Sequence, residues 1–294
     1  MGIDQKSIIK NWWTSHSQDY REEYKSEYLG ADLEELSDDK FIQYIENLDS
    51  VFAKKAYFAQ GRNKKLFSYL ITKESLKNKK VLEIGCGLGS HSQMLAERGS
   101  KLTAIDLSDK SIYATNRRLE LKGLKADVFQ ADCENLPFAD NSFDYIWSWG
   151  VIHHTPDTGK AAKEIMRVLK PRGQLDLMVY NNNSFYKFIN VYFRYGIMKL
   201  KFFQGYSKQD LKNMFTDGKE IGGAPLSKYY SKSEVVNLFY KLNLIRSTAY
   251  EQKNFITFWI PRKFKYTAEN LIPDSFYNFL FKDFGFLLFN SFIK

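Results

Sequence analysis

The chain has 294 residues, 44% of them hydrophobic, and a formal net charge of +9. This composition is typical of one globular core with additions and excludes a fibrous or disordered protein. The sequence contains no run of 18 uncharged apolar residues and no apolar signal-peptide centre, so neither a membrane-spanning helix nor secretion is expected. The two cysteines, Cys86 and Cys133, are too few for a metal framework and favour a reducing, cytoplasmic location.

The positive charge is concentrated in the last third of the chain. Residues 1–183 contain 26 basic and 26 acidic side chains, whereas residues 184–294 contain 17 basic and 8 acidic ones. Residues 184–294 also hold 28 of the 48 aromatic residues. Basic and aromatic residues together favour contact with an anionic apolar surface or with single-stranded nucleic acid. A lysine-rich surface over an ordinary aromatic core explains the same composition equally well.

The first 78 residues are expected to be helical. Ile3–Trp13 is a short amphipathic stretch, and Asp38 or Asp39 is positioned to begin a helix that runs to about Ala53. A further helix is expected over Lys64–Leu76. This region therefore predicts an arm of helices ahead of the core.

A glycine-rich stretch, Val81–Gly89, reads Val-Leu-Glu-Ile-Gly-Cys-Gly-Leu-Gly. Residues of strand type followed by alternate glycines predict a strand, a tight turn and a helix that starts near Ser90. Glycine lets the backbone turn sharply and lets a ligand approach closely, and the helix start offers unpaired N–H groups. The spacing differs from the Gly-x-Gly-x-x-Gly pattern of dinucleotide-binding folds.

Four more strand-like segments follow, and helical segments separate most of them. They are Lys101–Ile105, Ala126–Gln130, Asn141–Ser148 and Gln174–Tyr180. Asp106 ends the first of them, 21 positions after Gly85. An acidic residue at about 20 positions from the glycines binds ribose hydroxyls in nucleoside-binding α/β units.

In order and spacing, these elements resemble the class I S-adenosylmethionine-dependent methyltransferases, specifically the UbiE-like small-molecule group known as methyltransferase type 11. The resemblance is close over Lys79–Tyr180 and looser over Ser231–Pro261. It implies an α/β Rossmann-like fold with a seven-stranded, mostly parallel sheet whose last strand is antiparallel, an N-terminal helical arm and an inserted aromatic lid. It also implies S-adenosyl-L-methionine as cofactor and S-adenosyl-L-homocysteine as product.

The expected division of the chain follows from this resemblance. Leu244–Glu251 and Phe255–Ile260 are expected to form a hairpin that closes the sheet. The final tail is expected to cover the lid, to pair two protomers or to lie on a membrane. The segments are a helical arm (1–78), a cofactor-binding core (79–183), a lid insertion (184–230), completion of the core sheet (231–261) and an aromatic basic tail (262–294).

The resemblance also implies roles for individual residues. The glycines let the methionine part of the cofactor lie against the backbone, Asp106 accepts from the ribose, and Asp132 accepts from the adenine amino group. Trp13 and Tyr20 resemble an arm that closes over the cofactor, although packing of the arm on the core explains them equally well. The implied cofactor-binding residues are Glu83, Gly85, Cys86, Gly87, Gly89, Asp106, Leu107, Asp132, Cys133, Ser148 and Tyr20.

Two adjacent histidines, His153 and His154, follow the fourth core strand. In an open parallel sheet this is where ligands bind, and a neutral imidazole there is suited to remove a proton from the methyl acceptor. A His-His pair at this position also serves as a structural helix entry. The sequence leaves both interpretations open.

Departures from related groups narrow the expected substrate. After the fourth strand the chain reads Ser148-Trp149-Gly150-Val151, not the Asn/Asp-Pro-Pro-Tyr/Phe of enzymes that methylate amino groups of nucleic-acid bases. No carboxylate cluster for Mg²⁺ follows the fifth strand, so no metal site is expected. The sequence thus predicts methylation of a small, amphipathic or anionic acceptor. The alternatives are an RNA methyltransferase, with nucleic acid less favoured as a partner, and a catalytically silent binding or scaffold protein. Peripheral contact with an anionic membrane and a homodimer formed through the tail are further expectations.

Overall fold

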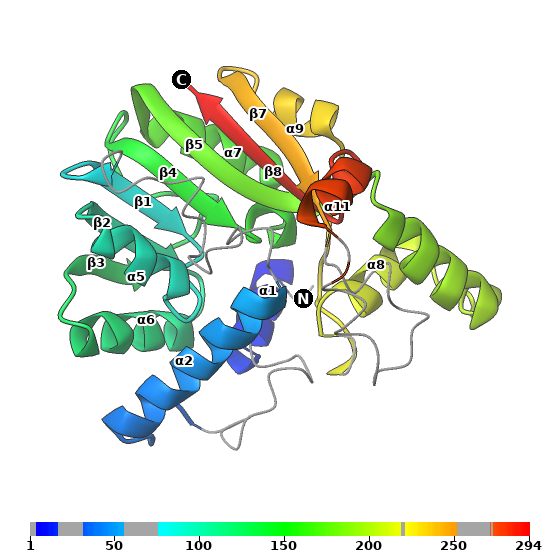
Figure 1. The fold of residues 1–294 in the computed structure, drawn as a ribbon, viewed down its shortest axis with the longest axis horizontal. Coiled ribbons are helices and arrows are strands. Elements are labelled where there is room, and N and C mark those ends of the chain that lie inside the picture. The colour runs from blue at the N-terminus through cyan, green and yellow to red at the C-terminus, as the bar shows by residue number, and fades with distance from the viewer. Residues whose placement is uncertain (1–3, 17–31, 56–75, 219–220, 252–270, 272) are drawn as a thin grey trace.

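The structure, a computed structural model, describes residues 4–16, 32–55, 76–218, 221–251, 271 and 273–294. Its centre is one sheet with the strand order β3-β2-β1-β4-β5-β8-β7 (Figure 1). The strands of this path are β1 (Lys80–Ile84), β2 (Lys101–Asp106), β3 (Ala126–Gln130), β4 (Phe143–Trp149), β5 (Leu169–Asn181), β7 (Asn243–Tyr250) and β8 (Leu287–Ile293).

Helices precede and separate these strands. Those of the arm and the first half are α1 (Gln5–Ser15), α2 (Asp38–Lys55), α5 (Ser90–Glu97), α6 (Asp109–Leu121), the 3₁₀-helix η3 (Ile152–His154) and α7 (Thr158–Val168). Those of the second half are the π-helix η4 (Tyr186–Met198), the 3₁₀-helix η5 (Phe202–Gln204), α8 (Lys208–Thr216), α9 (Lys232–Leu238) and α11 (Asp274–Phe281). Within the described residues, no helix is both long and apolar enough to cross a bilayer.

The sheet confirms the expected fold class. Strands β1 to β5 pair in parallel, and β8 is antiparallel to both of its neighbours, β5 and β7. The last strand of the chain is therefore the antiparallel one, as expected. A short strand, β6 (Tyr229–Tyr230), pairs in parallel with the end of β5.

The identity of the strand that completes the sheet corrects an expectation. Residues 287–293, assigned from the sequence to an aromatic tail, pair with β5 over Gln174–Tyr180 and separate β5 from β7. The strand expected over Phe255–Ile260 lies outside the described residues. Five consecutive residues of β8 are buried, so its sequence lacks the apolar–polar alternation that marks a half-exposed strand. This part of the tail belongs to the core.

Both faces of the sheet are covered, and alternate residues of one strand serve different faces. Leu82 and Ile146 are buried in the cluster that includes α7 and α9. Their neighbours, Val81 and Trp147, are buried in the cluster that includes α5. Because the middle strands are buried on both sides, the free space for a ligand is at their carboxyl ends.

The N-terminal arm is anchored to the core through α6. Phe41 and Ile45 of α2 are fully buried in a cluster that includes Ala114 of α6. Arg117 of α6 lies over the ring of Phe41 at 4.6 Å and donates a hydrogen bond of 2.8 Å to Asp38. Helix α1 lies across the carboxyl ends of the central strands (Figure 1).

Residues 184–230, the expected lid insertion, contain η4, η5, α8 and β6. Helices η4 and α8 pack together, with the rings of Tyr195 and Phe215 stacked at 3.8 Å. The hydroxyl of Tyr186 donates to the carbonyl oxygen of Phe215 at 3.0 Å. The two helices therefore form one unit beside the carboxyl end of β5.

Candidate functional site

The glycine stretch forms a tight loop between β1 and α5. Gly85, Gly87 and Gly89 have φ angles of 81°, 55° and 79°, in the left-handed region that only glycine adopts readily. The amides of Gly85 and Cys86 both donate to the carbonyl oxygen of Ile105, at 2.8 and 3.1 Å. The loop is thus fixed to the end of the neighbouring strand β2.

Gly85 also leaves no room for a side chain. A Cβ built on Gly85 would lie 2.1 Å from Cγ2 of Val151, and both residues line the same pocket. The chain after β4 therefore approaches the glycine loop as closely as a backbone without Cβ allows. The glycine loop and the chain after β4 therefore form one continuous side of the pocket.

A substitution at Gly85 tests this contact. We expect Gly85→Ala to lower the free energy of unfolding by about 3 kcal/mol, because a left-handed φ and an overpacked methyl each contribute about 1–2 kcal/mol. Gly123→Ala is the matched control, since Gly123 has φ +64° and no atom within 4 Å of the built Cβ. It should lose only about 1 kcal/mol in the same denaturant titration. Equal losses in the two variants would contradict the steric argument.

Asp106 stands at the carboxyl end of β2 and faces the pocket. Its carboxylate accepts hydrogen bonds from the amide of Gly87 at 3.0 Å and from the amide of Ser108 at 2.9 Å. Burial raises the pKa of Asp106, and these amide hydrogen bonds oppose the rise. Each carboxylate oxygen can accept one more hydrogen bond, so Asp106 can both hold the glycine loop and bind a ligand hydroxyl.

Asp132 comes from the neighbouring strand end. The amide of Ala131 donates to the carbonyl oxygen of Asp106 at 3.0 Å, and this bond brings the turn after β3 beside Asp106. One oxygen of Asp132 accepts from the amide of Glu134 at 2.9 Å. The other accepts from the ammonium group of Lys6 at 2.6 Å. The two carboxylates of Asp106 and Asp132 thus line one pocket from adjacent strands.

Lys6 ties α1 to this end of the sheet. Its ammonium group also bonds Oε2 of Glu134 at 2.6 Å, and the other oxygen of Glu134 accepts from the amide of Asp157 at 2.7 Å. Partial burial alone would lower the pKa of Lys6, but the hydrogen bonds to Asp132 and Glu134 outweigh it and raise that pKa. Lys6 is therefore charged at neutral pH and neutralises the acidic end of the pocket.

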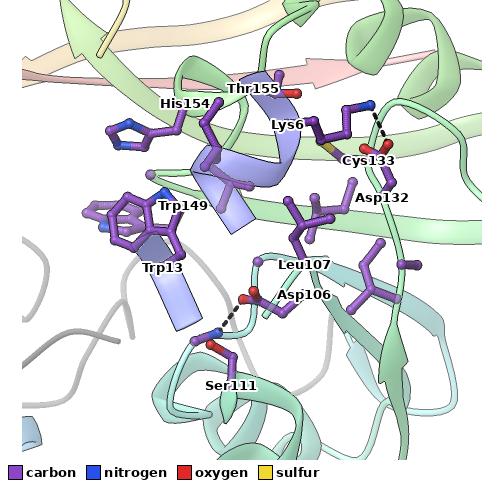
Figure 2. A pocket seen from close by; sticks show the side chains of 18 of the residues that line it. Lys6, Trp13, Asp106, Leu107, Ser111, Asp132, Cys133, Trp149, His154 and Thr155 are labelled. Carbon is purple, nitrogen blue, oxygen red and sulfur yellow. Dashed lines mark hydrogen bonds and ion pairs between the residues drawn. The ribbon is translucent and has the colours of Figure 1, made fainter. Parts of the chain in front are cut away.

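The pocket is enclosed by α1 on one side and by the strand ends on the other. Figure 2 shows Lys6 of α1 bonded to the carboxylate of Asp132, while Trp13 of the same helix and Trp149 line the pocket away from this bond. The wall is mostly apolar, with charged groups at separate places. It consists of Lys6, Ile9, Trp13, Ile84, Gly85, Gly87, Ile105, Asp106, Leu107, Ser111, Ala131, Asp132, Cys133, Trp149, Gly150, Val151, His154, Thr155 and Pro156.

The two histidines occupy different environments. His154 lines the pocket with its ring 5.0 Å from that of Trp13 (Figure 2). His153 does not line it; its ring packs 4.0 Å from that of Tyr180, and within the described part of the chain neither ring nitrogen has a hydrogen-bond partner. Burial lowers the pKa of His153 well below its usual range. His154 is therefore the histidine of the pocket, and His153 is a histidine of the core.

His154 has a defined tautomer. Its Nδ1 lies 2.6 Å from the carbonyl oxygen of Leu226, which can only accept, so Nδ1 carries the proton. Its Nε2 lies 3.5 Å from the carboxylate of Asp217, which also accepts from the hydroxyl of Tyr180 at 2.5 Å. Burial lowers the pKa of His154, and Asp217 partly offsets this. A proton bound at Nε2 would be stabilised by Asp217.

Several residues expected to bind the cofactor stand away from the pocket wall. Glu83 is fully buried under the loop, where Ser92 donates to it at 2.5 Å and burial raises its pKa to about 8. Cys86 is buried in the sheet core, and Gly89 instead allows α6 to approach, because a Cβ there would lie 3.1 Å from Thr115. The side chain of Ser148 is buried within β4.

The remaining expected residues are Gly85, Gly87, Asp106, Leu107, Asp132, Cys133 and His154, and all of them line the pocket. Tyr20 lies outside the described residues. The pocket is lined not by Ser148 but by the residues that follow it, Trp149 to Val151. Among the described residues, no cluster of three or more His, Cys, Asp or Glu side chains is arranged to hold a metal ion.

The sequence analysis did not identify Lys6, Ile9, Ser111 or Thr155 as site residues. Ser111 and Thr155 are close in sequence to Asp106 and His154, and this short separation could have indicated that they belong to the site. Lys6 is 126 positions from Asp132, and no local pattern indicated their contact. Ile9 is on the buried side of the amphipathic stretch that was expected to pack on the core.

Comparisons with known proteins agree with this geometry. Residues 82–176 match the family described as "Methyltransferase domain". The chain is 36% identical over 110 residues to tocopherol O-methyltransferase of Arabidopsis thaliana and 33% identical over 103 residues to sterol 4-C-methyltransferase of Caenorhabditis elegans. These matches cover 36% and 34% of the chain, but only 32% and 31% of those two relatives.

A longer but weaker match reaches beyond the core. Ubiquinone biosynthesis O-methyltransferase of Stutzerimonas stutzeri is 27% identical over 188 residues, which cover 59% of the chain and 81% of that protein. Among solved structures, a chain from the complex of the Haloferax volcanii Trm112 methyltransferase activator with a putative methyltransferase aligns with a TM-score of 0.52 at 16% identity, covering 87% of the chain and 97% of its own length.

The [4+2]-cyclase SpnF aligns with a TM-score of 0.51 at 13% identity, covering 85% of the chain and 82% of its own length. These structures share the fold. Since a cyclase shares it too, the fold alone does not determine the reaction. The strand order, the glycine loop and the family match together define a methyltransferase domain of the class I type in residues 82–176.

Proposed function

We propose that the protein transfers a methyl group from S-adenosylmethionine to a small molecule with an apolar body. The observation that carries this proposal is the placement of Asp106 and Asp132, on adjacent strand ends, in one pocket with the Gly85–Gly87 backbone. The chain after β4 meets the glycine loop so closely that a Cβ on Gly85 would overlap Val151. Such a loop suits a ligand that lies against the backbone, and the two carboxylates suit ribose hydroxyls and an adenine amino group.

Each side of the pocket has a distinct task in this proposal. Asp106 binds the ribose, Asp132 orients the adenine, and Leu107 and Ile105 pack against the apolar faces of the nucleoside. When bound, S-adenosylmethionine supplies a methyl group that is activated by the positive charge on sulfur. The chain then has to align the acceptor, exclude water and, for a protonated acceptor, remove a proton. Trp13 and Trp149 are placed to exclude water.

The identity of the acceptor class rests on two kinds of support. The pocket wall near His154 is formed by Trp13, Trp149 and Val151, which suit an apolar molecule. The names of three relatives refer to a sterol, to tocopherol and to ubiquinone biosynthesis. All three compounds are largely apolar. We infer that this chain also methylates an apolar acceptor, with His154 as the base where the acceptor carries a proton.

Calorimetry with S-adenosylhomocysteine and the full-length protein tests the cofactor assignment. We expect saturable binding of one molecule per chain. An analogue with hypoxanthine in place of adenine should bind at least tenfold more weakly, because its carbonyl oxygen would face the Asp132 carboxylate. Absence of binding by S-adenosylhomocysteine would refute the proposal. Incubation with labelled S-adenosylmethionine and either a lipid extract or total RNA then distinguishes an apolar acceptor from RNA.

A further inference from the structure

The segment from Ser184 to Gln209 has an unusual charge. It contains five basic residues and no acidic one, and the first carboxylate after it is Asp210. This segment includes η4 and the turn that leads to α8. The five basic residues are Lys187, Arg194, Lys199, Lys201 and Lys208. Lys187 is buried and bonds the side-chain oxygen of Asn182 at 2.7 Å, so the other four supply the positive charge of the surface.

The same segment exposes large apolar side chains. Phe188, Phe193 and Ile197 of η4 are 51%, 54% and 50% exposed. Their spacings of five and four residues are close to one turn of a π-helix, so they follow each other along one side of η4. Phe203, just beyond η4, is 79% exposed. Isolated exposed apolar residues are ordinary, but an aligned series on one helix marks an interaction surface.

Helix α11 extends this surface. In Figure 1, α11 lies beside the yellow-green helix η4. The amide of Phe185 donates to the carbonyl oxygen of Phe284 at 3.0 Å, and their rings stack at 5.0 Å. Phe276 and Phe279 of α11 are 55% and 66% exposed. We call the exposed apolar side chains of η4 and α11, with Phe203, the outer apolar face.

The charge distribution selects among the possible occupants of the outer apolar face. A second copy of the chain, joined through the same face by two-fold symmetry, would oppose the basic residues of 184–209 to one another without a carboxylate in that segment to pair them. Helix α11 begins with Asp274, and at its end Lys282 and Asp283 are both exposed, so these three residues add a net charge of −1 to the four surface basic residues of 184–209. An apolar surface with an excess of positive charge along η4 instead complements a lipid bilayer with anionic headgroups.

We propose that the outer apolar face binds the surface of an anionic lipid bilayer. Phenylalanine and isoleucine side chains enter the boundary between headgroups and acyl chains, and Arg194, Lys199 and Lys201 contact the headgroups. This inference goes beyond the proposed function, because bilayer binding needs neither cofactor nor methyl acceptor. The two statements can therefore fail independently.

The outer apolar face is linked to the candidate site through α8. Helix η4 packs on α8 by the stacked rings of Tyr195 and Phe215. Just after α8, the carboxylate of Asp217 lies 3.5 Å from Nε2 of His154 in the pocket. A bilayer bound to η4 would thus lie on a unit that also contacts the pocket wall, which suits an acceptor dissolved in lipid.

Vesicle flotation of the full-length protein tests the proposal. We expect binding to phosphatidylcholine vesicles that contain about one third phosphatidylglycerol, weak binding to pure phosphatidylcholine, and loss of most binding at high salt. Lys199→Gln/Lys201→Gln should weaken binding about 25-fold, or about fivefold for each basic residue. Phe193→Ser/Ile197→Ser should weaken it at least tenfold, because the inserted apolar area is lost.

Matched variants elsewhere on the surface provide the control. Lys125→Gln/Lys163→Gln removes the same charge from exposed lysines outside the segment, and Tyr240→Ser/Ile245→Ser removes side chains that are 63% and 57% exposed. Both should bind vesicles within about twofold of the unchanged protein. Equal effects of test and control variants would overturn the proposal. Equal binding to neutral and anionic vesicles, or no binding to either, would also overturn it. If vesicles are not bound and sedimentation shows dimers that Phe193→Ser/Ile197→Ser disrupts, the outer apolar face instead joins two copies of the chain.

Discussion

Replacing His154 by asparagine should lower kcat by about 10²–10⁴-fold, the usual contribution of a general base. The Nδ1–H of His154 donates to the carbonyl oxygen of Leu226, and the asparagine amide can keep such a bond while removing the basic Nε2. Affinity for S-adenosylhomocysteine should be retained, because this histidine is assigned to the acceptor and not to the cofactor. Single-turnover rates with labelled S-adenosylmethionine give the change in the chemical step.

The pH dependence of the same reaction checks the role independently. Burial lowers the pKa of His154 below its usual value of 6.5, with Asp217 opposing the shift. The base works in its neutral form, so kcat should rise with pH through this low pKa and be level from about neutral pH upward. Asp217→Asn removes the opposing carboxylate and should move the rising limb to still lower pH.

His153→Gln is the comparison for the pair of histidines. His153 is fully buried against Tyr180 and lies off the pocket wall, so this change should reduce stability without a specific loss of kcat in the folded enzyme. If His154→Asn retains nearly full kcat, His154 is not the base. If instead His153→Gln shows the larger loss of kcat at equal stability, the assignment of the two histidines is reversed.

The sequence predicted those parts of the structure that depend on neighbouring residues. The alternation of strand and helix, the glycine turn and the carboxylates at the strand ends each follow from a short stretch of chain. Asp106 directly follows buried residues of β2, and the parallel register then determines the end of the sheet at which it lies. The mostly parallel sheet and its antiparallel last strand were implied by the resemblance and are confirmed.

Features that depend on distant contacts could not be predicted in the same way. The bond between Lys6 and Asp132 joins residues 126 positions apart, and nothing near Lys6 indicates its partner. The two histidines are adjacent, and no sequence pattern distinguishes one from the other. Only the fold determines that His154 lines the pocket and His153 does not. Residues 287–293 have apolar side chains on both faces of the strand, interrupted by Asn290 and Ser291, which suits an interior strand as well as a membrane-binding tail. Only the pairing with β5 shows that these residues form a core strand.

Replacing Asp106 by asparagine should weaken S-adenosylhomocysteine binding about 100-fold, or about 3 kcal/mol, since a charged acceptor of two ribose hydrogen bonds is lost. The amides of Gly87 and Ser108 bond different oxygens of the carboxylate, and asparagine keeps one of these acceptors. That oxygen can still accept from the amide of Gly87, which keeps the contact to the glycine loop at the cost of the bond from Ser108. This distinguishes Asp106→Asn from Asp106→Ala, which removes both loop contacts and confounds loss of binding with loss of loop structure.

Asp127→Asn is the matched control, because Asp127 is exposed on the neighbouring strand β3 and lies off the pocket wall. It removes one negative charge from the strand that pairs with β2, three register positions before Asp106, so a general effect of net charge on ligand affinity appears there as well. We expect its affinity for S-adenosylhomocysteine to stay within about twofold of the unchanged protein, as is usual for a surface substitution. If calorimetry finds equal affinities for Asp106→Asn and Asp127→Asn, in variants of equal stability, the ribose is not bound at Asp106. The cofactor would then have to lie elsewhere in the pocket.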